Sequence, residues 1–349
     1  MSRYACIRAV ATYLPSAVET NDAENQRFIA KIGIKERHVA SAGESAGDLA
    51  VGAAENLLRE YDINRDEIDF ILLCVQHPDY TMPSTSCHIQ ARLGLPKSCG
   101  ALDYGLGCSG YPYGLALAKG LLETGMARRL LLLTSSVYLK FIGLKDHSCR
   151  PLFGDGATAT YITAEESETP FLHSFVFGTD GSLYDKLYIP VGGSRNPPHL
   201  HPEVTKTDER GNTRSNYETH MDGTAITYFT LREVPPLVEQ ILSRAGITRS
   251  ELDYCVFHQA NKFMLEYVRK KCRLTEVPFH NNIEKIGNTV SGSVPFALEE
   301  VLTAHNPAKL KRVMLAGFGV GLSWSGCMAD LSQVMAKKIH SEPDVKTVG

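Results

Sequence analysis

The chain has 349 residues, which is long enough for two domains of ordinary size, each with a substantial core. Hydrophobic residues make up 43% of the chain and charged residues 21%, which is typical of globular proteins and excludes disordered or fibrous ones. The formal net charge of −3 and the short, isolated pairs of basic residues give no reason to expect nucleic-acid binding.

The length of the apolar runs and the spacing of the cysteines indicate the cellular compartment. The longest apolar runs, at 71–75 and 130–133, are far shorter than the roughly 20 residues that a membrane-spanning helix needs. The first residues lack the apolar segment of a signal peptide. The nine cysteines show neither CxxC spacing nor a Cys/His cluster of zinc-site type. We therefore expect reduced thiols, no bound metal and a cytoplasmic location.

Short continuous apolar runs recur along the chain at 70–75, 129–134, 157–163, 254–257 and 312–316. Such runs are typical of strands buried on both faces, and helical periodicity lies between them, for example at 114–123. The alternation predicts an α/β fold with functional groups on the loops after the strands. Residues 190–222, rich in Pro, Gly, His and charge, break this pattern and predict either a functional lid or a mobile surface loop. The polar tail, 335–349, is expected to add little to the core.

An internal repeat divides the chain. Residues 56–75 and 240–259 both run from an amphipathic helix through a polar turn into an apolar strand, at an offset of about 184 residues. Two further similar pairs follow at nearly the same offset and in the same order. The repeat predicts a duplicated domain, with an N-terminal half at 1–170 and a C-terminal half at 171–334.

Cys108 differs from the other cysteines in its surroundings. It lies in the segment YGLGCSGYPY, on a glycine-flanked turn at the start of a predicted helix. Backbone N–H groups and the helix dipole favour an anion there, so we expect the thiol pKa to fall below its reference value of about 8.5. Most cysteines are structural, and we expect this of Cys6, Cys74, Cys255 and Cys327, which lie in strand-like runs. Cys108 is therefore the candidate nucleophile.

Two polar residues of the second half are candidates to act with Cys108. His258 ends the predicted strand 254–257, at the place that Cys74 occupies in the first half. A lone histidine is more often a surface or core residue, but this position at a strand end favours a functional role. Asn288 lies in a turn before another helix, where an isolated Asn would be interpreted as a cap or turn residue. The repeat places it near the counterpart of Cys108, so we expect all three side chains to face one centre.

Two glycine-rich turns are the remaining candidate functional segments. GFGVG at 317–321 follows a strand and lacks the spacing of a dinucleotide or phosphate-binding loop. We expect it to supply a backbone N–H group to an oxyanion. FGDGA at 153–157 contains Asp155, for which we expect a structural role because a turn between elements favours Gly and Asp.

Together, these residues resemble the beta-ketoacyl-acyl-carrier-protein synthase III family of the thiolase superfamily. The resemblance runs from about Tyr4 to Leu331 and depends on short motifs in a specific order and spacing. The motifs are GIKERH (33–38), PSTSCHIQ (83–90), the Cys108 turn, FGDGA (153–157), HQAN (258–261), GNT (287–289) with SVP (293–295), and GFGVG (317–321). The resemblance implies the thiolase fold, a duplicated five-layered αβαβα architecture.

The resemblance also implies a catalytic triad of Cys108, His258 and Asn288. Cys108 would attack an acyl thioester, and the backbone N–H groups of Cys108 and Val320 would hold the oxyanion. His258 Nε2 and the Asn288 amide would then donate to the carbonyl of a malonyl thioester and stabilise the enolate left by loss of CO2. Asn donates without being ionisable, whereas an acid there would point to acyl transfer onto other acceptors. The implied reaction is a decarboxylative condensation.

Several positions implied to bind substrate depart from the family pattern. Arg27 and His147 stand where the family usually has a tryptophan and an arginine that sandwich the adenine of coenzyme A. Lys31 replaces an arginine, and Phe263 replaces an arginine that helps to dock acyl carrier protein, although Lys262 remains beside it. These departures predict a specialised paralogue and not the housekeeping initiator of fatty-acid synthesis.

The resemblance implies partners as well. Met82 stands where the family places a residue that reaches across a homodimer to the acyl pocket. The implied partners are acyl-CoA or acyl-ACP, a malonyl thioester and acyl carrier protein, with no cofactor, nucleic acid or membrane.

Three alternatives remain open. The first is acyl transfer from Cys108 to a hydroxyl or amine, or condensation without decarboxylation. The second is a non-catalytic thiolase-fold subunit, against which the intact Cys/His/Asn set argues. The third is a generic two-domain binding protein, for which the repeat alone would be enough.

Overall fold

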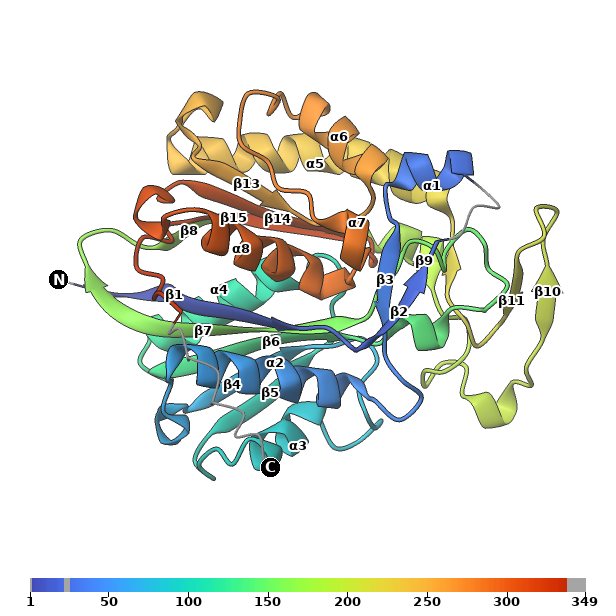
Figure 1. Ribbon diagram of the computed structural model, residues 1–349, viewed down its shortest axis with the longest axis horizontal. Helices are drawn as coiled ribbons and strands as arrows, with labels where there is room; N and C mark the ends of the chain where they lie inside the picture. Colours follow the sequence, from blue (N-terminus) through green and yellow to red (C-terminus); the bar gives the residue numbers. More distant parts are fainter. Residues whose placement is uncertain (1, 22–25, 338–349) are drawn as a thin grey trace, which may run out of the picture.

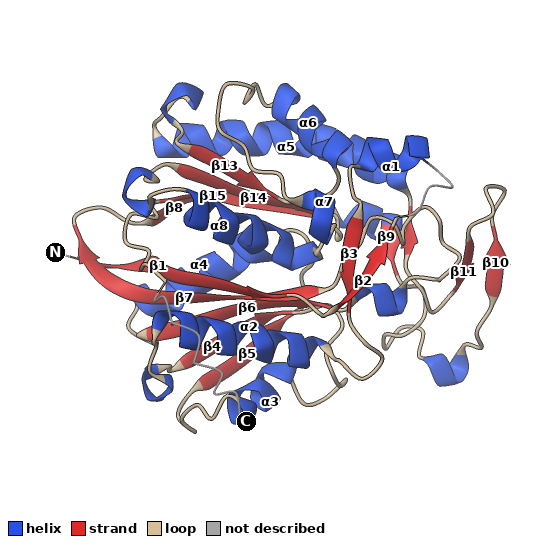
Figure 2. Ribbon diagram, viewed as in Figure 1, coloured by secondary structure: helices blue, strands red, loops and turns tan. Residues whose placement is uncertain are grey.

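The computed structural model describes residues 2–21 and 26–337. Its elements form five layers, with helices outside and in the centre and two sheets between them (Figures 1 and 2). This layered arrangement agrees with the five-layered αβαβα architecture of the thiolase fold expected from the sequence.

The first sheet has five strands in the order β1-β7-β6-β4-β5. The strands are β1 (Ser2–Tyr13), β4 (Phe70–Cys74), β5 (Gly100–Tyr104), β6 (Arg129–Ser136) and β7 (Gly156–Ser167). β4 is parallel to β5 and β6, whereas β7 is antiparallel to β6 and β1. β4 reads FILLC, and its last four residues are buried, as expected for a strand covered on both faces.

The second sheet repeats this plan with four strands in the order β13-β14-β15-β8. The strands are β8 (Leu172–Thr179), β13 (Tyr254–Phe257), β14 (Val313–Gly319) and β15 (Ser323–Ala329). β13 is parallel to β14, and β15 is antiparallel to β14 and β8. The series β13-β14-β15-β8 therefore matches β4-β6-β7-β1 in order and direction.

A turn with the same hydrogen bonds occurs in each half, which supports the duplication. The carboxylate of Asp69 accepts hydrogen bonds from the backbone N–H groups of residues 128–129, which lead into β6. The carboxylate of Asp253 does the same for residues 311–312, which lead into β14. The boundary between residues 170 and 171 remains a prediction.

Six main helices form the three helical layers. They are α2 (Ala46–Tyr61) and α3 (Thr85–Arg92) on the first sheet, α5 (Gly223–Ala245) and α6 (Lys262–Lys271) on the second, and α4 (Gly110–Glu123) and α8 (Ser293–Ala304) between the sheets (Figure 1). α2 begins with a capping box in which Ser45 and Asp48 each bond to the other's backbone N–H group, worth about 1 kcal/mol. α4 and α8 bury Leu115 and Leu298 in the central core. This central core joins the two sheets, because residues of both sheets pack in it against α4 and α8.

Smaller elements complete the fold. They are β2 (Ala17–Thr20), α1 (Gln26–Ile32), β3 (Glu36–Val39), β9 (Leu187–Tyr188), β10 (Thr205–Thr207), β11 (Thr213–Ser215), β12 (His220–Met221) and α7 (Ile283–Ile286). α1 contacts α6, so this N-terminal segment lies against the second half.

The strand predictions are confirmed, with shifts at the ends. All five predicted strands are present; β6 and β7 run further than expected, and β14 continues to Gly319. The first residues of the tail contact the rest of the protein, since the Met335 N–H donates to the Arg8 carbonyl and Lys337 pairs with Glu60 and Glu299. That the tail adds little to the core stays a prediction. The remainder of the tail, 338–349, lies outside the described residues. Within the described ranges, no helix combines the length and the apolar character needed to cross a membrane.

Candidate active site

Cys108 lies in the turn between β5 and α4, which we call the nucleophile turn (residues 105–109). The end of β14 packs directly against it. A Cβ atom at Gly319 would lie 2.8 Å from Cys108 Sγ, and one at Gly317 would lie 2.4 Å from the Cys108 carbonyl oxygen. Glycine at these positions therefore allows β14 to approach the nucleophile turn closely. This close approach brings the Val320 N–H group to the Cys108 sulfur.

Buried serines tie the nucleophile turn to the loop that carries Val320. Ser109 Oγ lies 2.6 Å from Ser323 Oγ, and Ser323 Oγ donates to the Val320 carbonyl at 3.0 Å. Ser325 Oγ donates to the Ser109 carbonyl at 2.7 Å. All three serines are buried, so these bonds are shielded from water.

The expectation of a lowered Cys108 pKa is wrong. The side chain is only 4% exposed, and burial raises the thiol pKa to about 12. The backbone N–H groups of Val320 and of Cys108 itself act in the opposite direction, but their effect is smaller. The resting side chain is a neutral thiol, next to two N–H groups able to stabilise negative charge.

His258 follows β13 and is buried at the same centre. Its Nδ1 lies 2.6 Å from Ser293 Oγ, and the ring meets the edge of Phe318 with centroids 5.6 Å apart. Because Nδ1 is occupied, Nε2 is the ring nitrogen available to a ligand in the cavity. Burial lowers the His258 pKa to about 3, so the ring is neutral near pH 7.

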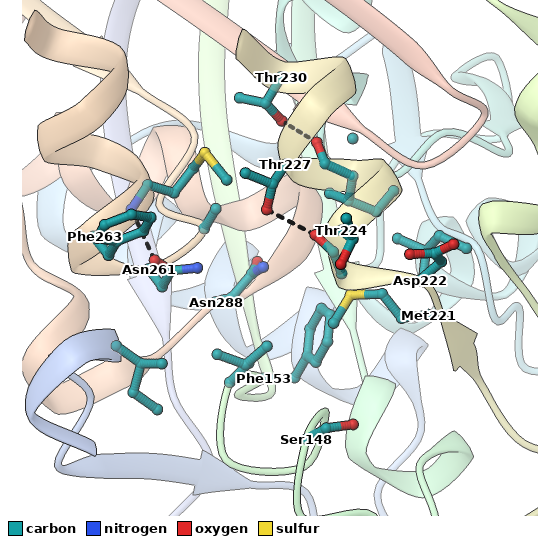
Figure 3. Close-up of a pocket in the computed structure, with 18 of the residues that line it drawn as sticks. Ser148, Phe153, Met221, Asp222, Thr224, Thr227, Thr230, Asn261, Phe263 and Asn288 are labelled. Carbon is teal, nitrogen blue, oxygen red and sulfur yellow. Dashed lines mark hydrogen bonds between the residues drawn. The ribbon is translucent and has the colours of Figure 1, made fainter. Parts of the chain in front are cut away.

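Asn288 is held so that its amide nitrogen is the free end. Its Oδ1 accepts from the Val290 N–H group at 2.9 Å. Its backbone N–H donates to the Leu152 carbonyl at 2.8 Å, and its carbonyl accepts from the Gly154 N–H at 3.0 Å. The side-chain Nδ2 is left as a donor toward the cavity (Figure 3).

The three predicted residues meet at one cavity of about 730 Å³, lined by Cys108, His258 and Asn288 together with Phe318 and Gly319. The first turns of α5, with Thr224, Thr227 and Thr230, form another part of the wall (Figure 3). Residues of α1, α6 and the β10–β11 hairpin also line it. Cys108 comes from the first half and the other two residues from the second, so the chemical groups converge only when the halves pack.

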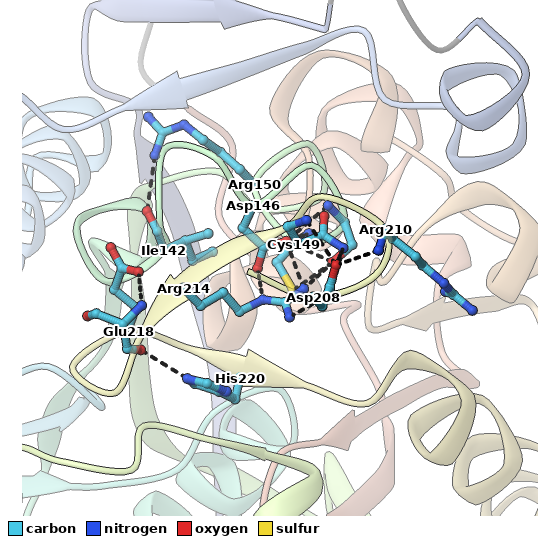
Figure 4. Close-up of polar contacts among 12 residues, drawn as sticks. Ile142, Asp146, Cys149, Arg150, Asp208, Arg210, Arg214, Glu218 and His220 are labelled. Atoms are coloured by element: carbon cyan, nitrogen blue, oxygen red, sulfur yellow. Dashed lines mark hydrogen bonds and ion pairs between the residues drawn. The ribbon is translucent and has the colours of Figure 1, made fainter. Parts of the chain in front are cut away.

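The β10–β11 hairpin is firmly anchored beside the cavity. Arg214 Nε and Nη2 donate to the Asp146 carboxylate at 2.5 and 3.1 Å, and Nη2 also donates to Ser148 Oγ at 2.7 Å (Figure 4). Although burial acts to raise the pKa of Asp146, the bonds from Arg214 and Ser148 hold it below its usual value. Residues 208–214 contribute to the cavity wall, so this part of the 190–222 segment belongs to the site and is not a detached surface loop.

Only two of the predicted substrate-binding residues line this cavity. Lys31 and Phe263 do, and Lys31 Nζ lies 4.5 Å from the centre of the Phe263 ring. Lys262 borders a separate cavity of about 440 Å³. The other three, Arg27, His147 and Met82, are exposed and lie outside the cavity lining.

Other predictions concern supporting residues. Asp155 is buried and accepts from the backbone N–H groups of Ala40 and Leu139, which confirms its structural role. Cys6, Cys74, Cys255 and Cys327 are buried, as expected of structural cysteines. No cluster of three or more His, Cys, Asp or Glu side chains suited to a metal ion occurs among residues 2–21 and 26–337.

Sequence reasoning missed several residues of the site. Ser293 and Phe318 flank the His258 ring, and Ser109 and Ser323 join the nucleophile turn to the Val320 loop. Ser293 and Phe318 lie within motifs already recognised, SVP and GFGVG, and each motif adjoins a candidate residue. That adjacency was the available signal, but it did not indicate which atoms the side chains contact.

Comparison with known proteins agrees with this geometry. Residues 102–181 match the family described as 3-Oxoacyl-[acyl-carrier-protein (ACP)] synthase III, and residues 242–331 match its C-terminal family. The Beta-ketoacyl-[acyl-carrier-protein] synthase III of Caldanaerobacter subterraneus subsp. tengcongensis is 33% identical over 94% of this chain and 98% of its own.

Two solved structures are also similar. A crystal structure of a 3-oxoacyl-(acyl-carrier-protein) synthase III is 43% identical, with a TM-score of 0.89 over 94% of this chain and 99% of that one. The 3-oxoacyl-(acyl-carrier protein) synthase of Burkholderia xenovorans LB400 is 35% identical, with a TM-score of 0.87 over 95% of each chain. Fold and site together define a condensing enzyme of the thiolase type. The chain belongs to the 3-oxoacyl-acyl-carrier-protein synthase III family, and it is an acyltransferase of that kind.

Proposed function

We propose that Cys108, His258 and Asn288 carry out the two halves of a decarboxylative condensation. In the first half, Cys108 Sγ attacks the carbonyl of an acyl thioester, the thiol of the carrier leaves, and the acyl group stays on Cys108. The N–H groups of Cys108 and Val320 stabilise the oxyanion of the tetrahedral intermediate. Their place beside Sγ supports this role.

In the second half, a malonyl thioester enters the same cavity. Its thioester carbonyl accepts from His258 Nε2 and Asn288 Nδ2 while the carboxylate leaves as CO2, and the enolate carbon then attacks the acyl group on Cys108. Two neutral donors suit this step, because they stabilise the enolate oxygen without pairing with the carboxylate that must leave. The pKa of His258, lowered by burial, keeps the ring neutral.

A single observation carries the proposal: one cavity brings a thiol from the first half to an imidazole and an amide from the second. Lys31 and Arg210 also line it. Both are cations, which suits the phosphates of coenzyme A or of a carrier's phosphopantetheine arm.

The test measures both half-reactions. The enzyme is incubated with an acyl-CoA and malonyl-ACP, and CO2 release, acyl mass on the protein and the 3-oxoacyl product are quantified. We expect one CO2 per product molecule. Loading without CO2 release would overturn the proposal and favour transfer to a hydroxyl or amine, which a panel of such acceptors would then reveal. Absence of loading by every donor would favour a non-catalytic subunit.

We propose that the enzyme is a specialised paralogue, with an acyl donor other than acetyl-CoA. Arg27, His147 and Phe263 support this, since each differs from the residue that the family usually has at its position. A panel of acyl-CoA and acyl-ACP donors tests it. Fast condensation of acetyl-CoA with malonyl-ACP, above all other donors, would defeat the idea.

We further propose a cytoplasmic homodimer that needs no cofactor and accepts malonyl groups from acyl carrier protein. The edge strand β5 carries Leu102, which is 47% exposed, and Met82 is 81% exposed, which supports a second copy beside them. Lys262, Lys270 and Lys271 of α6 suit an acidic carrier. Light scattering on the wild type and on Leu102→Lys tests the dimer, which the variant should weaken.

A further inference from the structure

The buried cluster around Cys108 is mainly apolar but includes the hydroxyl of Tyr138. The Tyr138 ring stacks on the ring of Phe153, with centroids 4.7 Å apart. Phe153, labelled in Figure 3, lines the cavity together with Cys108. Tyr138 therefore backs the part of the cavity wall beside the nucleophile, and an acyl group on Cys108 begins inside this cluster.

Thr219 brings a second hydroxyl to this place. It is fully buried, and its backbone N–H donates to the Phe141 carbonyl at 2.7 Å. Its Oγ1 makes no hydrogen bond within the described residues. Burial raises the pKa of Tyr138, a negative charge on Cys108 would raise it further, and Thr219 acts in the opposite direction. The phenol thus lies near both the nucleophile and the Thr219 hydroxyl.

The Tyr138–Thr219 pair holds two hydroxyl protons. Because no hydrogen bond of normal geometry reaches Thr219 Oγ1 within the described residues, its proton is unused. A slight movement that joined the two hydroxyls would use one proton and leave the other without an acceptor. A buried hydroxyl without a partner costs free energy and is uncommon in folded proteins. A ligand that supplies the missing acceptor would account for it.

A second unpaired oxygen borders the nucleophile turn. Gln76 Oε1 is buried and has no hydrogen-bond donor among the described residues. It lies against Gly107, where an added Cβ atom would be 2.7 Å from it, one residue before Cys108. A donor is thus missing at Gln76 and an acceptor at Thr219. A hydroxyl group can be either, whereas an alkyl group is neither and a ketone only accepts.

The surroundings of the pair favour an uncharged group. The ring of His77 packs edge-on against Tyr138, with centroids 5.2 Å apart. Burial lowers the pKa of His77 to about 4, so this ring is neutral near pH 7 and offers no positive charge to a carboxylate.

We propose that Cys108 is loaded with a hydroxyacyl group, whose hydroxyl accepts a hydrogen bond from the Tyr138–Thr219 pair. This inference rests on the proposed function and names the class of its acyl donor. An alkyl acyl group of the same length would cover the pair and separate it from water without offering an acceptor. Sites that bond a substrate hydroxyl discriminate strongly against analogues that lack it.

Acyl donors of equal length test this class. Loading of Cys108 by racemic 3-hydroxybutyryl and 3-hydroxydecanoyl thioesters is compared, by intact mass, with loading by butyryl and decanoyl thioesters. Each acyl group is supplied both on CoA and on acyl carrier protein. We expect kcat/KM for loading to be at least about 10-fold higher for the hydroxyacyl member of the preferred length. Equal or faster loading by the alkyl member would overturn the inference.

A double variant tests which residues bind the hydroxyl. Tyr138→Phe/Thr219→Val removes both hydroxyls and keeps the shapes of the side chains. The two members of each pair should then load within about 3-fold of each other, because the alkyl donor no longer covers an unpaired hydroxyl. Loading by the alkyl donor at the wild-type rate or faster also shows that the variant is folded. A preference for the hydroxyacyl donor that persisted in this variant would overturn the inference.

The matched control is Tyr111→Phe/Thr160→Val. These side chains form another buried pair of hydroxyls, with oxygens 3.1 Å apart, away from the cavity lining. This variant should keep the wild-type preference. Loss of the preference in the control as well would mean that it depends on general packing, and would contradict the assignment to Tyr138 and Thr219.

Failure of the proposed function has a different signature. Absence of loading by every donor would overturn the proposed function, and the inference with it. Loading without CO2 release in the presence of malonyl-ACP would overturn the decarboxylative reaction alone, because the preference between paired donors is measured on loading and still decides the inference.

Discussion

The nucleophile turn and the donor pair, His258 with Asn288, line the same cavity. They differ in the kind of hydrogen-bond donor that they present to it. In the proposed mechanism, the groups beside Cys108 that face developing charge are backbone N–H groups, and side chains only hold the two loops together. In the donor pair, the proposed mechanism requires the side chains themselves to present a proton, and each side chain has a hydrogen-bond partner that orients it. Backbone donors survive most substitutions, whereas side-chain donors do not. Changes around Cys108 should therefore have graded effects, and changes to the pair large ones.

The largest effect is expected from Cys108→Ala. Acyl loading should fall by at least about 10³-fold, because the covalent intermediate cannot form. CO2 release from malonyl-ACP should persist, since the donor pair is intact. Intact mass and CO2 assays measure the two activities. Cys87→Ala, which removes an exposed thiol, is the control and should load normally. Loss of both activities in a folded Cys108→Ala protein would show that the two regions do not act separately.

Asn288→Asp should have the opposite effect to Cys108→Ala: CO2 release should be lost and acyl loading kept. A carboxylate keeps the oxygen that accepts from Val290 but lacks the N–H donor and adds negative charge beside the enolate. We expect CO2 release to fall about 10²–10³-fold and loading to change less than about 3-fold. Asn306→Asp is the matched control, because Asn306 accepts from the N–H group two residues on in the same way. Equal falls in both assays would contradict the division of labour.

The pH dependence of alkylation tests the ionisation of the Cys108 thiol, independently of the donor pair. Since burial raises the Cys108 pKa to about 12, only a small fraction is thiolate at pH 7, and that fraction grows tenfold per pH unit. The rate of iodoacetamide labelling at Cys108 should therefore rise about 100-fold from pH 7 to pH 9, without a plateau. Peptide mapping at each pH isolates this site from the other cysteines. A plateau near neutrality would mean a preformed thiolate and would remove the contrast with the uncharged donor pair.

The smallest effect is expected from Ser323→Ala. It removes the hydroxyl that joins Ser109 to the Val320 carbonyl but leaves the Val320 N–H group in place. Loading should slow about 3- to 10-fold, because the donor is less well oriented, a fraction of the loss expected for removing it. CO2 release should be unchanged. Ser135→Ala is the matched control, because Ser135 is also buried and donates to a backbone carbonyl, that of Ala46. A loss as large as that of Cys108→Ala would mean that the serine does more than hold the loop.

Much of the site was predictable from local patterns. Continuous apolar runs identified the strands, and β13 has the predicted bounds, because a strand buried on both faces needs such a run. The glycine-flanked turn identified Cys108, and the repeat indicated that His258 and Asn288 oppose it. The order of short motifs identified the family, which the comparisons confirm.

The remaining features depend on contacts between distant segments. Ser109 and Ser323 are 214 positions apart, and Arg214 meets Asp146 across 68, so no local pattern encodes either pair. The Cys108 pKa moved opposite to expectation for the same reason. A turn sequence reveals nearby N–H groups, but burial is set by the packing of both sheets and outweighs them. The sequence by itself determined which residues form the candidate site, because residue type and spacing are local. Only the tertiary structure decided their charge, orientation and partners, because these depend on what packs against them.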